Sequence, residues 1–144
     1  MRVEFQRLDP EVALPRSARD GDAGLDLQAN ADLVVGPGER AMVPTGLAVA
    51  IPEGHAGLVL PRSGLASRRG LTLANAPGLI DAGYRGEVTI AVVNLDPKEP
   101  VEIRRTDRIA QLVVVPFADV EPVDVADLPP SARGSAGFGS TGLR

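Results

Sequence analysis

The sequence contains no cysteine and only one histidine, His55. Without thiols the chain can form neither a disulfide nor a cysteine metal site, and it has no thiol nucleophile. A single imidazole excludes a multi-histidine zinc cluster and argues against a Ser-His-Asp triad. Any bound metal must therefore be held by oxygen ligands, which points to a hard cation such as Mg²⁺.

Long apolar runs are also missing, as is the apolar core of a signal peptide at the start of the chain. These absences predict a cytoplasmic protein with no membrane partner. One lysine, Lys98, accompanies fourteen arginines, and the net charge is −4. An acidic chain is a poor partner for long nucleic acid, whereas the planar fork of arginine suits bidentate binding of a small phosphate anion.

Glycine and proline, with 16 and 13 copies among 144 residues, punctuate short runs rich in β-branched residues. Strands are expected near Val3 and Phe5 and at 32–35, 42–43, 47–51, 57–60, 88–93, 101–103 and 112–115. Because proline cannot donate to a ladder, strand ends or edges are expected at Pro44, Pro52, Pro61, Pro97, Pro100 and Pro116. The pattern predicts an all-β sandwich, barrel or jelly roll with at most a helical turn at 65–69, and leaves the topology open.

The stretch 78–88 interleaves Asp81, Tyr84, Arg85 and Glu87 with three glycines, directly before an apolar run. Glycine lets a backbone approach a ligand closely because it has no Cβ. A carboxylate and a guanidinium on such a turn could activate a water and hold an anion. Taken alone, the stretch fits an ordinary hairpin equally well, with Asp81 in an Asx-turn.

Two further stretches carry chemically useful side chains. Asp26 lies between two leucines, so it faces either a cleft or, as is commoner, open solvent. Arg62 and Ser63 precede a glycine and the possible helical turn, an arrangement that suits an anion. Ser63 as a plain N-cap explains the same residues.

The segment 133–142 is too glycine-rich to fold by itself, and Pro129 and Pro130 separate it from the rest of the chain. We therefore divide the chain into a β domain, residues 1–128, and an arm, residues 129–144. A disordered tail explains the composition. Arg133 and Phe138 also fit a lid in which an arginine meets phosphate and an aromatic ring stacks on a base.

These stretches, in this order, resemble the five motifs of the trimeric dUTP pyrophosphatases (dUTPases). The motifs read Ala23 to Ala29, Pro61 to Ala66, Gly78 to Glu87, Asp107 to Leu112 and Arg133 to Gly142. One departure is Ala136, at a position where the family usually has glycine. The resemblance implies a jelly roll that assembles as a homotrimer, with active sites shared between subunits and closed by the C-terminal arm. It implies hydrolysis of dUTP to dUMP and pyrophosphate, which keeps uracil out of DNA and supplies dUMP for dTMP synthesis.

The resemblance also assigns roles. Asp81 matches the general base, and Asp26 is expected to hold Mg²⁺ through water. Arg85 and Glu87 are expected to be structural ion-pair and hydrogen-bond partners. Substrate contacts are expected from Arg62, Ser63, Gly64, Asn75, Tyr84, Gln111, Arg133, Phe138, Gly139 and Ser140. Among these, Asn75 would pair with uracil, Tyr84 would lie against the deoxyribose and Phe138 would stack on the base.

Two other functions are compatible with this fold. A dCTP deaminase would need different residues around the base to activate water at the ring, and the region 80–85 fits the pyrophosphatase better. A nucleotide-responsive regulatory protein would be expected to lack the general base or the arm. Asp81, Arg133 and Phe138 are all present, which argues against that alternative.

Overall fold

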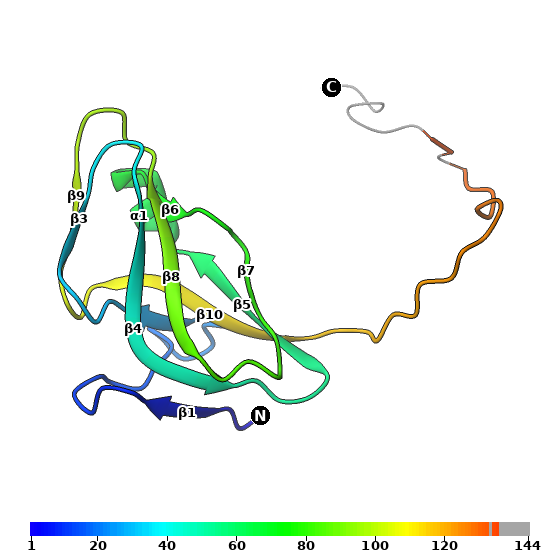
Figure 1. Cartoon of the computed structure of the whole chain (residues 1–144), viewed down its shortest axis with the longest axis horizontal. Coiled ribbons are helices and arrows are strands. Elements are labelled where there is room, and N and C mark those ends of the chain that lie inside the picture. Colours follow the sequence, from blue (N-terminus) through cyan, green and yellow to red (C-terminus); the bar gives the residue numbers. More distant parts are fainter. Residues whose placement is uncertain (133, 136–144) are drawn as a thin grey trace.

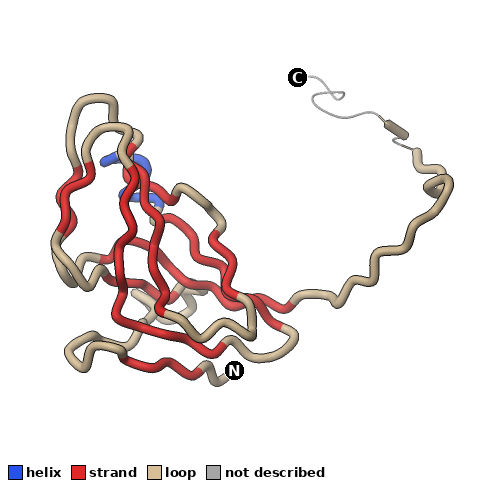
Figure 2. Tube along the Cα trace, in the orientation of Figure 1, coloured by secondary structure: helices blue, strands red, loops and turns tan. Residues whose placement is uncertain are grey.

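The computed structural model describes residues 1–132 and 134–135, and it contains two four-stranded antiparallel sheets, a two-stranded sheet and one short helix (Figures 1 and 2). The elements are β1 (Glu4–Arg7), β2 (Leu25–Gln28), β3 (Leu33–Val35), β4 (Arg40–Ala50), β5 (His55–Pro61), α1 (Ser63–Arg69), β6 (Leu71–Leu73), β7 (Gly78–Ile80), β8 (Glu87–Asn94), β9 (Val101–Ile103) and β10 (Arg108–Pro116). The predicted all-β, jelly-roll-like class is confirmed. Among the described residues, no helix has the length and apolar character needed to cross a membrane.

The first sheet has the order β1-β4-β8-β6 and the second β2-β10-β5-β7, while β3 pairs with β9. Alternate side chains of β8 point inward: Val88, Ile90, Val92 and Asn94 are buried, and their neighbours are less so. This period of two is the pattern from which the strands were predicted. One cluster of buried side chains draws on both four-stranded sheets, so the core lies between them.

Pro44 lies inside a strand and does not end one, so of the two predicted positions, strand end or strand edge, it takes the edge. It pairs with Thr89 of β8, and the register shifts between Pro44 and Ala48, where Gly46 has a φ of 67°. The other neighbour, β1, pairs with β4 only from Leu47 to Ala50. The proline therefore occupies a part of β4 that is paired on one side, next to a bulge, where its missing N–H breaks no ladder.

Strands β2, β6 and β7 were not in the predicted series. Each is short and contains at most one β-branched residue (LDLQ, LTL and GLI), so none forms the β-branched run on which the prediction depended. The folded body ends at β10, and residues 118–132 are exposed and extend away from the sheets (Figure 1). The division into residues 1–128 and 129–144 stays a prediction.

Candidate active site

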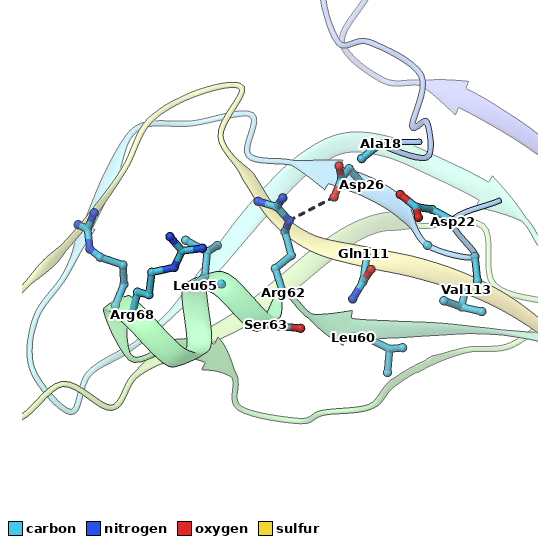
Figure 3. A pocket seen from close by; sticks show the side chains of 14 residues that line it. Ala18, Asp22, Asp26, Leu60, Arg62, Ser63, Leu65, Arg68, Gln111 and Val113 are labelled. Carbon is cyan, nitrogen blue, oxygen red and sulfur yellow. Dashed lines mark ion pairs between the residues drawn. The ribbon is translucent and has the colours of Figure 1, made fainter. Parts of the chain in front are cut away.

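One cavity, of about 840 Å³, opens beside α1 and the end of β5 (Figure 3). We call it the arginine cavity; its lining includes Asp22, Asp26, Arg62, Ser63, Arg68 and Gln111. The sheet explains why residues so far apart in the chain meet. Gln111 of β10 is paired with Asp26 of β2 on one side and with Leu60 of β5 on the other. Asp26 therefore faces a cleft, as one of the two interpretations of its strand required.

Asp26 is fixed by two arginines. Its Oδ1 lies 3.2 Å from Arg62 Nε, and its Oδ2 accepts a hydrogen bond from Arg108 Nη1 at 3.0 Å. Arg62 Nη1 also donates to the Arg108 carbonyl at 3.0 Å, so the three residues form a closed ring of contacts. The Asp26 side chain is only 15% exposed, where a charge-assisted hydrogen bond is stronger than in water. This arrangement holds the Arg62 guanidinium at the cavity wall (Figure 3).

Arg108 was missed by the sequence analysis, although it belongs to the fourth motif. Arg108 is the first residue of β10 and stands three residues before Gln111. Its position close to a predicted substrate-binding residue was the signal in the sequence that could have identified it. Gln111 itself donates from Nε2 to the Pro61 carbonyl at 3.1 Å. That bond ties the amide to the end of β5, directly before Arg62.

Ser63 is the first residue of α1, and Arg62 occupies the N-cap position without a side-chain capping bond. The interpretation of Ser63 as a plain N-cap is therefore wrong, and its exposed hydroxyl faces the cavity together with Gly64. A Cβ at Gly64 would lie 3.4 Å from Arg68 Nη2. The Arg68 guanidinium thus lies beside the first turn of the helix, as the one-turn spacing from Gly64 allows.

A second cavity, of about 380 Å³, lies at the connection between β6 and β7, which belong to different sheets, and at the turn that follows β7. We call it the Asp81 cavity; its lining includes Asn75, Gly78, Ile80, Asp81, Tyr84 and Thr89. Asp81 directly follows β7 and is exposed. Its turn is closed by a backbone bond of 3.0 Å, from the Tyr84 N–H to the Asp81 carbonyl, rather than through the carboxylate as an Asx-turn needs. Asn75 lies over Gly78, since a Cβ there would be 3.4 Å from Asn75 Nδ2.

The remaining side chains of this turn stabilise it. Tyr84 Oη donates to the Glu87 carbonyl at 2.9 Å, and Glu87 Oε1 accepts the Gly46 N–H at 2.7 Å. Arg85 Nη1 donates to the carbonyls of Ala82 and Tyr84 at 2.6 and 2.7 Å. Glu87 is thus a hydrogen-bond partner, as expected, whereas the contacts of Arg85 within the described chain are with backbone carbonyls and not with a carboxylate.

Asp81 and Arg62 lie at opposite ends of β5, although the two cavities are lined by neighbouring residues of that strand, Leu60 and Val59. Strand β7 pairs with β5 through Gly57 and Ile80, so Asp81 falls beside Ala56, six residues from Arg62. At about 3.4 Å per residue, the two side chains are attached roughly 20 Å apart along the strand. One chain therefore cannot bring Asp81 and Arg62 to the same phosphorus atom.

The described residues fit a hard cation held through water better than a directly ligated one. No group of three acidic or histidine side chains that could hold a metal is found in residues 1–132 and 134–135. Each Asp26 oxygen already contacts one arginine, Oδ1 as an ion pair with Arg62 and Oδ2 through a hydrogen bond from Arg108. A carboxylate oxygen has a second lone pair, which can accept a hydrogen bond from a metal-bound water. The predicted contacts of Arg133, Phe138, Gly139 and Ser140, and the effect of Ala136, lie outside the described residues.

The fold and the two cavities define a class of protein: an all-β protein with an arginine-lined cavity suited to a polyphosphate. Comparison with known proteins gives the family. The dUTPase family profile matches residues 10–142. The chain belongs to the dUTPase family.

Relatives of this chain are named deoxyuridine 5'-triphosphate nucleotidohydrolase. The protein of Thermobifida fusca is 56% identical over 142 residues, which cover 99% of this chain and 79% of the relative. That of Corynebacterium glutamicum is 52% identical over 140 residues, covering 97% and 94%. The dUTPase of Staphylococcus bacteriophage 80alpha, solved with dUPNHPP, is 31% identical with a TM-score of 0.91, and the match covers 99% of both chains. A mutant dUTPase of the Staphylococcus aureus phage phi11, whose structure describes coordination of a structural Mg(II) ion, is 28% identical with a TM-score of 0.81, covering 88% and 98%.

Proposed function

We propose that this protein hydrolyses dUTP to dUMP and pyrophosphate in sites that are shared between the subunits of a homotrimer. The observation that carries the proposal is the separation of Asp81 from Arg62, which are attached about 20 Å apart along β5 and line different cavities. The arginine cavity of one subunit would face the Asp81 cavity of the next. Repeated under threefold rotation, this contact closes a ring with three equivalent sites.

Asp81 acts on the water in this proposal. Its exposed carboxylate takes a proton from the water while the water oxygen attacks the α-phosphorus. The bond from that phosphorus to the α–β bridging oxygen breaks, and pyrophosphate leaves with the bonding electrons. A positioned carboxylate of this kind contributes about 10²–10⁴-fold to the rate.

The arginine cavity binds the triphosphate. Arg62, held by Asp26, offers a planar fork to phosphate oxygens, and the Ser63 hydroxyl and the Gly64 N–H lie beside it. Mg²⁺, when bound to the triphosphate, would neutralise part of its charge, with Asp26 holding its waters. Arg133 on the arm is expected to contact the γ-phosphate.

The Asp81 cavity selects the nucleoside. Asn75 would pair with the edge of uracil, where cytosine would present a donor to a donor and leave buried polar groups mispaired. Tyr84 would lie against the deoxyribose, and Phe138 on the arm would stack on the base, a contact worth about 1–3 kcal/mol. The names of the relatives speak for hydrolysis rather than for deamination of dCTP.

The activity is tested by measuring pyrophosphate release with Mg²⁺ from dUTP, dTTP, dCTP and UTP. We expect rapid release from dUTP alone, and its loss in Asp81→Asn, which keeps the shape of the side chain and removes the base. Binding of dUTP without turnover would indicate that the protein is a nucleotide sensor and not an enzyme. Formation of a deaminated product from dCTP would move the assignment to the deaminase.

Sharing of sites is tested by mixing two inactive variants, Asp81→Asn and Arg62→Gln, after they are unfolded together and reassembled. In a randomly mixed ring each site takes its two cavities from neighbouring chains, so about a quarter of the sites are intact. Recovery of about that fraction of the native activity is expected. If the mixture stays inactive although mixed trimers form, the two residues do not meet across a subunit boundary.

A further inference from the structure

The ring of Tyr84 forms a wall of the Asp81 cavity without being buried itself. The residue is 46% exposed, and its side chain lines the cavity together with those of Asp81 and Asn75. The only hydrogen bond of the side chain among the described residues runs from Oη to the Glu87 carbonyl at 2.9 Å. A half-exposed ring held by one bond needs a second contact to keep it in one position.

Gly86 makes that contact possible, because without a Cβ its backbone lets the Tyr84 ring lie against it. A Cβ at this position would collide with Tyr84 Oη and would lie 2.7 Å from Cζ and 3.1 Å from Cε2. Gly86 has no positive φ, so its backbone would accept an alanine, and the need for glycine comes from the phenol alone. Gly83, in the same turn, has no positive φ either, and a Cβ there would meet nothing within 4 Å.

We propose that Gly86 is a positioning residue that sets the sugar specificity of the enzyme, because its bare Cα seats the Tyr84 ring against the backbone. This inference rests on the proposed function, in which Tyr84 lies against the deoxyribose. An alanine at 86 displaces the phenol and breaks its bond to the Glu87 carbonyl. The exposed ring swings out at little cost in stability, and the wall that leaves no room for a 2′-hydroxyl opens. Ribonucleotides then gain access to the site.

The inference is tested by measuring kcat/KM for dUTP and for UTP in the native protein, in Gly86→Ala and in the matched control Gly83→Ala. A close-packed wall rejects a substrate that carries one extra hydroxyl by about 10²-fold, so we expect Gly86→Ala to lower the dUTP preference by about tenfold. Gly83→Ala should keep the native preference. A merely structural defect would lower both kcat/KM values together and leave their ratio unchanged.

Coupling to Tyr84 separates this mechanism from an independent effect of residue 86. In a Tyr84→Ala background, Gly86→Ala should not change the preference further, because the ring that it displaces is absent. Tyr84→Phe, which keeps the native turn sequence at 86, should also lower the preference, since it removes the bond that anchors the ring. If Gly86→Ala does not fold, Tyr84→Phe still tests whether the position of the ring sets the preference, and an unchanged preference in that variant would overturn the inference.

An unchanged preference in Gly86→Ala, or an equal effect of that change with and without the Tyr84 ring, would overturn the inference while leaving dUTP hydrolysis intact. Failure of the native protein to hydrolyse dUTP would overturn the proposed function as well. The two failures are therefore told apart by the native protein itself.

Discussion

Asn94 is the polar side chain on which we expect the fold to depend most. It is fully buried at the end of β8, and its Nδ2 donates to the Val35 carbonyl at 3.0 Å and to the Glu99 carbonyl at 2.8 Å. Its Oδ1 accepts the Asp96 N–H at 2.9 Å. The side chain thereby joins β8 to β3 and to the loop before β9.

Asn94→Ala removes all three hydrogen bonds. At about 1 kcal/mol of net stability each, their loss costs about 3 kcal/mol. We expect the free energy of unfolding to fall by about 3 kcal/mol, a large part of the roughly 5–15 kcal/mol that stabilises an ordinary domain.

The measurement is urea unfolding followed by far-ultraviolet circular dichroism, because the sequence has no tryptophan and only one tyrosine. Protein concentration must be the same for each variant, since assembly shifts apparent stability. Asn75→Ala serves as the control, because that asparagine is exposed and its loss should cost less than about 0.5 kcal/mol. A loss below about 1 kcal/mol in Asn94→Ala would refute the reasoning.

Two further predictions concern single carboxylates. Glu87→Ala leaves the Gly46 N–H without its acceptor and should lower stability by about 1.5–3 kcal/mol in the same urea experiment, whereas Glu87→Gln keeps an acceptor and should lose less. The pKa of Asp96 lies below its ordinary value of 3.8 because its carboxylate accepts the N–H groups of Glu99 and Lys98. Because the folded-state pKa is lowered, the Asp96 carboxylate stabilises the fold above pH 3.8, and this stabilisation is lost as the pH falls through the folded-state pKa. An NMR titration of the Asp96 carboxyl should show a midpoint below 3.8, and a midpoint at or above that value would contradict the assignment.

The strand pattern could be predicted where a strand is rich in β-branched residues. Residues 101–103 and the run 88–93 were found with nearly the observed bounds, because valine and isoleucine dominate both and buried and exposed side chains alternate there. The joining of 42–43 and 47–51 into the single strand β4 was not predictable, because Pro44 reads locally as a stop. What lets the chain continue is a neighbour, β8, that pairs on one side of the proline.

For the site, the available residue types could be listed from the sequence alone. The absence of cysteine and the single histidine leave oxygen ligands and arginines for a phosphate site, and the five motifs identify the family. These are properties of side-chain chemistry and order along the chain, and they need no coordinates.

Which of those residues meet depends on how the strands pair. Antiparallel pairing places Asp26 beside Gln111, and it places Asp81 at the opposite end of β5 from Arg62. It also closes the contacts of Arg108 with Asp26 and Arg62, and it lays the Tyr84 ring against Gly86. Register and packing depend on contacts between residues far apart in the chain, and a one-dimensional pattern does not specify them.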